Sequence, residues 1–152
     1  QQMLGAAEQK EMGIAMLKLQ PKAGFNQKKD INLVLRDKSP NKQLAILLAL
    51  QLQKNWEGSR INMVTIVSND QDREEQEEFF HQVKEAARMP DNTTINIIEG
   101  SFPDDIERFP HCDLAICGTP DEISLEFVRN IAAHSEVSCL FVKDSGEESA
   151  FV

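Results

Sequence analysis

The sequence contains no apolar run long enough for a membrane-spanning helix. Its longest apolar stretch, from Leu44 to Leu52, is interrupted by Gln51 and falls far short of the ~20 residues such a helix needs. Positive charge is also scarce, since 16 Lys and Arg stand against 25 Asp and Glu in 152 residues, a formal charge of −9. Nucleic acid and anionic lipid attract clustered basic residues, so this balance disfavours both partners. We expect one soluble domain that does not insert into a membrane.

Cysteine is rare as well. Cys112, Cys117 and Cys139 are odd in number and lie in apolar surroundings, which indicates reduced, buried thiols of a cytosolic protein. A zinc site would need His111, Cys112 and Cys117 together. If residues 111–117 form one strand, Cys112 and Cys117 point to opposite faces, while His111 and Cys117 lie ~20 Å apart. The sequence therefore predicts no metal site.

The 7 glycines form no dinucleotide fingerprint and no phosphate loop. Gly118 alone follows an expected strand and opens an expected helix, where backbone N–H groups can bind a phosphate. Pro120 removes one such donor, while Asp121 and Glu122 place negative charge where the anion would lie. A plain turn between strand and helix is the favoured interpretation, and a nucleotide site near Gly118 is the alternative.

Paired catalytic residues are missing too. There is no G-x-S-x-G motif, and no cysteine and histidine can be placed within hydrogen-bonding reach from the sequence. The carboxylates occur in solvated blocks, of which Glu74, Glu75, Glu77 and Glu78 form one. We therefore expect a protein that is not an enzyme, with no catalytic residues and no cofactor.

What the sequence does contain is a repeated alternation of strands and helices. Apolar periodicity predicts strands at 14–19, 31–36, 61–67, 93–98, 113–117 and 137–142, with helices between them from the second strand onward. Such alternation favours a mostly parallel open sheet with helices on both faces, because right-handed crossovers return each helix over the sheet. The fold class is therefore three-layer α/β. Only the first two strands invite antiparallel pairing, as a hairpin.

Several helix boundaries carry sequence signals. Ser39 and Pro40 predict the start of the first long helix, whose leucines at 44, 47, 48 and 52 are expected to face the core. Asn69 or Asp70 is expected to cap the next helix. Thr119 stands three residues before Glu122, the capping-box spacing, and so predicts the start of the last helix.

The first twelve residues are expected to belong to a different unit from the rest of the chain. The sequence opens Gln1-Gln2-Met3, without a leading methionine or a secretory segment, so we expect the chain to begin inside a larger protein. Residues 1–12 are interpreted as the end of a helix from a preceding domain. Residues 13–152 are expected to form a single α/β domain.

Two stretches resemble the C-terminal cytosolic domain of cation-chloride cotransporters, membrane proteins of the amino acid-polyamine-organocation superfamily. In residues 31–67, an aliphatic strand leads into a leucine-rich helix ending Lys54-Asn55-Trp56, then Gly58 and a strand beginning Arg60-Ile61-Asn62. Residues 113–151 are similar to the last helix and strand of that family, including a Ser124-x-x-Phe127 start and a basic residue, Lys143, in the closing strand.

This resemblance implies a universal-stress-protein-like fold, of which this chain is the second of two tandem units. It implies a cytosolic regulatory and dimerisation domain, on the cytoplasmic side of the membrane, of a secondary transporter that carries chloride with sodium and/or potassium. The implied partners are its own transmembrane domain and a second copy. The long phosphorylation-rich insertions of animal members are missing, so a compact prokaryotic member is expected.

Trp56 and Phe151 are the apolar residues considered as contacts for such partners, and packing in the core is the favoured interpretation for both. The competing function is a freestanding, nucleotide-binding protein of the universal-stress type, with its ligand near Gly118. The ATP-binding glycines of that family are missing here.

Overall fold

The computed structural model describes residues 6, 12–25, 27–36, 38–120 and 124–151. Six strands form one sheet in the order β1-β6-β5-β2-β3-β4, in which β1 is antiparallel to β6 and every other neighbouring pair is parallel. The elements are β1 (Ile14–Lys18), β2 (Asp30–Val34), α2 (Lys42–Asn55), β3 (Arg60–Val67), α3 (Asp70–Ala86), β4 (Thr94–Glu99), the 3₁₀ turn η1 (Ile106–Arg108), β5 (Leu114–Gly118), α4 (Leu125–Ser135) and β6 (Ser138–Lys143).

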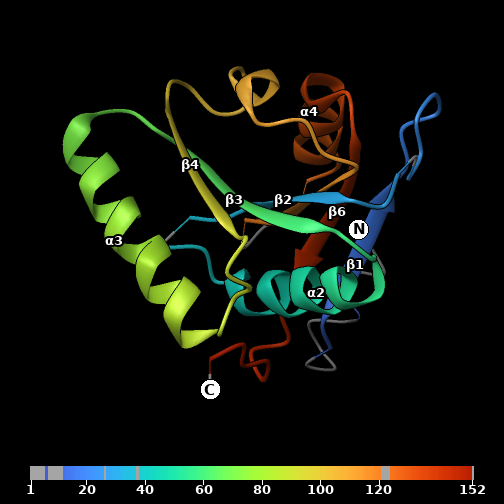
Figure 1. Ribbon diagram of the computed structural model, residues 1–152. Helices are drawn as coiled ribbons and strands as arrows, with labels where there is room; N and C mark the ends of the chain where they lie inside the picture. The colour runs from blue at the N-terminus through green and yellow to red at the C-terminus, as the bar shows by residue number, and fades with distance from the viewer. Residues whose placement is uncertain (1–5, 7–11, 26, 37, 121–123, 152) are drawn as a thin grey trace.

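The helices form layers on both faces of the sheet (Figure 1). Helices α2 and α3 pack on one face, and α4 and η1 lie over the other. The predicted three-layer α/β fold is confirmed. The expected strands match the six observed ones to within two residues at each end.

The predicted hairpin between the first two strands is wrong. Strand β1 pairs with β6 at the edge of the sheet, from Ile14 opposite Lys143 to Lys18 opposite Cys139, whereas β2 lies between β5 and β3. Residues 19–29 carry the chain from the edge to the centre. Alternating apolar residues indicate that a segment is a strand. They do not indicate which strand it pairs with, because that depends on which neighbouring strands complete the burial of its side chains. Strand β2 needs two neighbours, because Ile31 and Leu33 are fully buried.

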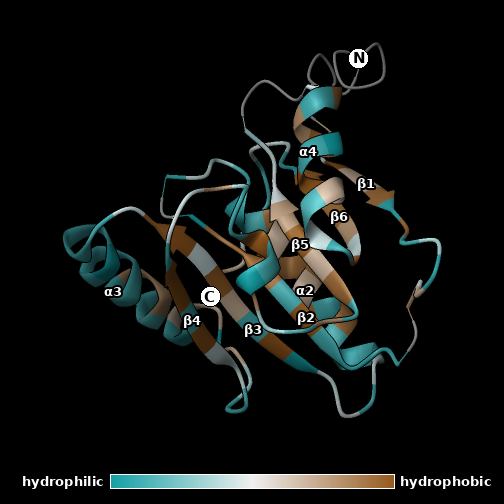
Figure 2. Cartoon of the chain, turned by 90° about the horizontal axis from the view of Figure 1, so that it is seen from above, coloured by the Kyte–Doolittle hydropathy of each residue, from teal (hydrophilic) through white to brown (hydrophobic). Residues whose placement is uncertain are grey.

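Successive side chains of each strand point to opposite faces of the sheet, and this separates the buried apolar residues into two clusters. Residues such as Leu33, Met63 and Ile116 point toward α2 and α3, whereas Cys117 and Phe141 point toward α4. Each fully buried side chain of this size contributes roughly 1.5–3 kcal/mol relative to exposure. Figure 2 shows the apolar residues along β3, β4 and β5 and the hydrophilic surface of α3.

The four leucines predicted to face the core from α2 do pack against it, but they are not the most buried residues of the helix. Ala45, Ile46 and Ala49 are fully buried, while the four expected leucines are only half-buried on its flanks. The helix is apolar nearly all round, so periodicity does not single out one face. The two alanines let the helix backbone approach the sheet closely, which leaves the larger leucines at the sides.

Two predicted helix starts are also wrong. The residue before α2 is Asn41, not Ser39, and its side chain does not cap the helix. Helix α4 begins at Leu125, where the hydroxyl of Ser124 accepts the N–H of Phe127 at 3.0 Å. Thr119 is buried instead, and its hydroxyl donates to the carbonyl of Val142 at 3.0 Å. A hydroxyl already bonded to the last strand is not available as a cap.

The start predicted for α3 is confirmed, since Asn69 accepts the N–H of Asp72 at 2.9 Å. The four glutamates of the acidic block on α3 are exposed to solvent, as expected. The helix end predicted within residues 1–12 and the side chains of Asp121, Glu122 and Ile123 fall largely or wholly outside the described residues.

Candidate functional site

The order of the parallel strands places a switch point between β2 and β5. From β2 the chain proceeds outward to β3 and β4, and from β5 it proceeds in the opposite direction to β6. Open α/β sheets bind ligands beyond the carboxyl ends of their strands at such a point. A cleft of about 300 Å³ lies there. Its walls include Arg36, Lys38, Thr65, Gly118 and Phe127.

The backbone around Gly118 is closed to a phosphate. A side chain at Gly118 would come within 2.9 Å of the Ser39 hydroxyl, so another segment already occupies this space. The N–H of Thr119 donates to the carbonyl of Val142 at 2.9 Å, and Pro120 has no N–H. Neither residue therefore offers a backbone donor to an anion, and the geometry at these positions matches the plain turn.

One of the two cationic residues in the cleft, Arg36, contacts an aromatic ring. The guanidinium of Arg36 lies 5.3 Å from the ring centroid of Phe102, a cation–π contact. Phe102 in turn packs at 6.5 Å from Phe127 at the start of α4. These contacts join the loop after β2 to the helix on the opposite side of the cleft.

A second cavity, of about 280 Å³, lies beneath α4 and η1. All three cysteines line it, together with His111 and His134. The prediction that Cys112 and Cys117 point to opposite sides of the sheet is wrong, because both side chains line this cavity. Strand β5 begins only at Leu114, so Cys112 lies in the preceding loop and turns toward the same space as Cys117. Even so, within the described ranges no three His, Cys, Asp or Glu residues gather closely enough to hold a metal ion.

The thiols in this cavity are protonated at neutral pH. Burial raises the pKa of Cys112 to about 12, and burial likewise raises the pKa values of Cys117 and Cys139. The Ser135 hydroxyl lies 3.1 Å from the sulfur of Cys139. The prediction of reduced, buried thiols is confirmed, since all three are free and buried.

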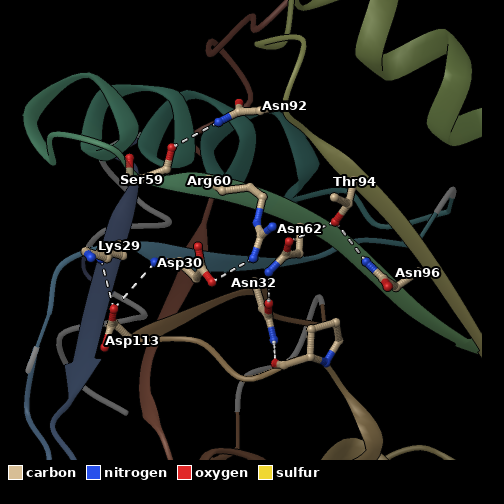
Figure 3. Close-up of polar contacts among 11 residues, drawn as sticks. Lys29, Asp30, Asn32, Ser59, Arg60, Asn62, Asn92, Thr94, Asn96 and Asp113 are labelled. Carbon is tan, nitrogen blue, oxygen red and sulfur yellow. Dashed lines mark hydrogen bonds and ion pairs between the residues drawn. The ribbon is translucent and has the colours of Figure 1, made fainter.

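A chain of polar side chains crosses the sheet from this cavity to β4 (Figure 3). Asn32 donates to the carbonyl of Pro110 at 2.7 Å and accepts from the amide of Asn62 at 2.9 Å. Thr94 donates to Asn62 at 2.8 Å, and Asn96 donates to Thr94 at 3.0 Å. Sequence reasoning missed this chain. Its signal was an asparagine at the third position of both apolar strands, β2 and β3.

Next to this chain, Asp113 fastens the loop before β2. Its carboxylate accepts the N–H of Lys29 at 2.9 Å and more distant N–H groups of Gln27 and Asp30, at 3.4 Å each. The carboxylate of Asp30 pairs with Arg60 at 3.0 Å. That ion pair is partly exposed and contributes little by itself. These contacts set the register of β2 rather than form a reactive site.

The two apolar residues singled out from the sequence have different surroundings. Trp56 is half-buried and packs against Phe25, with ring centroids 5.7 Å apart, so it belongs to the core. Phe151 is 36% exposed. The other large apolar side chains exposed among the described residues are Met12, Leu17, Leu19 and Leu125. Three of these lie on or beside β1.

The opposite edge of the sheet is covered by charge. Cationic side chains from α3 and η1 donate to carbonyls along β4: Arg73 to Ile97 at 3.0 Å, Lys84 to Thr93 at 3.0 Å and Arg108 to Glu99 at 2.8 Å. Charged side chains on an edge strand oppose pairing with another chain. The β1 edge, with its exposed leucines, is therefore the more favourable edge for a protein contact.

No helix in the described part of the chain combines the length and the apolarity needed to span a bilayer. A search of curated proteins found no match. Among solved structures, the chain is similar to the cytoplasmic domain of a prokaryotic cation chloride cotransporter, with a TM-score of 0.87 and 28% identity over 98% of this chain. The chain spans only 59% of that structure's length.

The chain is also similar in fold to a universal stress protein from Archaeoglobus fulgidus DSM 4304. The TM-score is 0.60 at 12% identity, covering 88% of this chain and 50% of the stress protein. The universal-stress-protein-like fold is thus confirmed. The model of the second C-terminal domain of prokaryotic cation-chloride cotransporters matches residues 25–151. This chain belongs to that family, which is defined by a transporter domain and not by an enzymatic activity.

Proposed function

We propose that this chain is a cytoplasmic regulatory and dimerisation domain of a secondary transporter that carries chloride with sodium and/or potassium. The observation that carries the proposal is the match of residues 25–151 to the cotransporter family. The proposed partners are the transporter's own transmembrane domain and a second copy of the chain.

The domain arrangement expected from the sequence belongs to the same proposal. Within this proposal, residues 13–152 are the second of two tandem α/β units. The description of the family as a second C-terminal domain supports this arrangement. The solved relative, of which this chain spans 59%, leaves room for another unit of similar size.

Regulation by such a domain requires contacts that differ between transport states. A domain that binds two conformations of the membrane part equally shifts neither, however tightly it binds. The surface that we propose for contacts lies along β1, where Leu17 is 49% and Leu19 is 48% exposed. This surface belongs to an edge strand, so apolar packing and strand pairing are both open to it.

The decisive experiment measures chloride uptake by the full transporter reconstituted in vesicles. We expect Leu17→Lys to change the rate of uptake while leaving its dependence on the co-transported cation in place, because the ion path lies in the membrane part. Leu125→Lys is the matched control, since Leu125 is 54% exposed and lies on α4, not on the edge strand β1. Uptake that proceeds without a chloride gradient or without the co-transported cation would contradict the proposal. Uptake that is unchanged when the C-terminal domain is removed would contradict it as well.

The nucleotide-binding alternative receives no support from the residues around the switch point. The backbone N–H of Thr119 is already hydrogen-bonded, Pro120 has no N–H, and Gly118 faces Ser39. Likeness to a universal stress protein at 12% identity concerns the fold alone.

A further inference from the structure

The cavity beneath α4 is unlike a packing defect, because its floor and its mouth differ in character. The floor consists of buried side chains, among them Cys117, Cys139, Ala115 and Ile131. The mouth is polar and includes four exposed titratable residues: Glu107, His111, His134 and Glu136. An apolar floor with a few polar groups at its entrance is the usual construction of a small-molecule site.

We propose that this cavity binds a small neutral molecule, with an apolar body about the size of one aromatic ring and a single hydrogen-bonding head. The body lies against the thiols and Ile131, and the head lies at the mouth near Ser135. This site is independent of the proposed transport function, and the chain tested alone is sufficient to examine it.

The size of the ligand follows from the volume. The cavity measures about 280 Å³. An engineered apolar cavity of roughly 150 Å³ in another protein binds benzene, so one ring with a short substituent fits here. Thioether and thiol sulfur make favourable contacts with aromatic rings, and this cavity is lined by every cysteine of the chain. A ring is therefore the body that these walls suit best.

The neutrality of the ligand follows from the floor. No Lys, Arg, Asp or Glu lies among the buried lining residues, and the three thiols are uncharged because burial raises their pKa values. A charge on the part of the ligand that lies against this floor would lose its hydration without gaining an opposite charge. A soft metal ion would need thiolates, which these surroundings disfavour.

The hydrogen-bonding head follows from the groups at one side of the cavity. The Ser135 hydroxyl contacts the sulfur of Cys139 at 3.1 Å and the carbonyl of Val137 only at 3.5 Å. Both contacts are weak, because one partner is sulfur and the other is at the limit of a hydrogen bond. A ligand hydroxyl at this position offers a stronger partner.

The experiment titrates 4-fluorophenol, a ring with one hydroxyl, into the purified chain and follows fluorine NMR. We expect saturable binding with a Kd of ~1 mM or tighter, given the small number of atoms in the probe. Nuclear Overhauser contacts from the ring protons should reach the methyl groups of Ala115 and Ile131. Contacts to methyl groups elsewhere, or no saturable binding, would overturn the proposal.

A pair of variants tests the site by filling it. Ala115→Leu adds carbon atoms inside the cavity, whereas Ala133→Leu makes the same change at an exposed position of α4. We expect at least ~10-fold weaker probe binding for Ala115→Leu and unchanged binding for Ala133→Leu. Equal affinity in both variants would overturn the proposal. If Ala115→Leu fails to fold, the Overhauser contacts in the unaltered protein decide the question alone.

Discussion

Asn41 and Asp144 are joined by a hydrogen bond of 2.9 Å, in which the N–H of Asp144 donates to the side-chain oxygen of Asn41. Asn41 directly precedes α2, and Asp144 directly follows β6. The amide nitrogen of Asn41 also donates to Thr119, to its carbonyl and to its hydroxyl, the latter at 3.2 Å. One buried side chain therefore fastens the start of α2 to the ends of both β5 and β6.

We expect Asn41→Ala to lower the free energy of unfolding by about 2–4 kcal/mol, because it leaves buried donors and acceptors on two other segments unpaired. Asn130→Ala is the control, since Asn130 is exposed on α4 and should change stability by less than about 0.5 kcal/mol. Urea unfolding measures both. Equal stabilities of the two variants would show that the Asn41 contacts contribute nothing net.

Asp144 predicts a pH dependence of stability. Burial raises the pKa of this carboxyl, and the charge of Glu148 adds to the effect, while the N–H of Leu44 opposes it. The folded state then binds more protons than the unfolded state between the ordinary pKa of 3.8 and the raised one. Stability contributed by Asp144 is therefore present at low pH and lost as pH rises through this window.

We expect Asp144→Asn to remove this loss, because an amide oxygen still accepts the Leu44 N–H but carries no charge. Unfolding of the two proteins across acid to neutral pH should show the variant gaining stability relative to the parent as pH rises. Parallel curves would mean that Asp144 titrates alike in the folded and unfolded chains.

The polar chain across the sheet gives a third prediction. Asn62 is only 2% exposed and bonds to both Asn32 and Thr94. We expect Asn62→Ala to cost about 2–4 kcal/mol, since the buried Asn32 and the half-buried Thr94 both lose their partner. Asn92→Ala removes one long bond, of 3.4 Å to Ser59, from an exposed side chain and should cost under about 1 kcal/mol. Thermal unfolding distinguishes them, and the reverse order would contradict this account.

A fourth prediction concerns dimerisation along β1. We expect Leu17→Lys to weaken self-association of the purified chain by ~10-fold or more, because a charge replaces an apolar contact at an edge strand. Leu125→Lys carries the same change away from that edge and should associate as the parent does. Light scattering over a concentration series gives the measurement. Identical association of both variants would move the interface away from β1.

A fifth prediction tests the nucleotide-binding alternative. A ligand present at 100 times its Kd stabilises a fold by ~2.7 kcal/mol, which raises the melting temperature by several degrees. We expect a panel of adenine and guanine nucleotides to leave the melting temperature unchanged, because Thr119 and Pro120 offer no free backbone donor. A saturable rise with any nucleotide would favour the stress-protein alternative.

The sequence predicted much of the secondary structure because the signals are local. Asn69 is one of the two caps expected for α3, and it is a local one, since its side chain bonds to the N–H of Asp72 only three residues away. Thr119 carried an equally good local signal, yet its hydroxyl bonds to Val142 on another strand. A capping motif indicates only that a side chain is able to cap a helix. Whether it does so depends on whether a distant group binds that side chain instead.

The same distinction applies to the candidate sites. That the thiols are buried followed from their apolar neighbours in the sequence. Their gathering in one cavity did not, because Cys112 reaches it from the loop before β5, whose course depends on distant contacts.

The order of strands and helices, the polarity of each segment and the family resemblance were thus determined by the sequence itself. Hydrophobic spacing, glycine positions and caps act within a few residues of each other, so they can be read along the chain. Only the tertiary structure decided that β1 joins β6, that Ala45, Ile46 and Ala49 are buried more deeply than the leucines of α2, and that Asn41 bonds to Asp144. Each of these depends on residues far apart in sequence, where burial and pairing are settled by what the whole chain packs together.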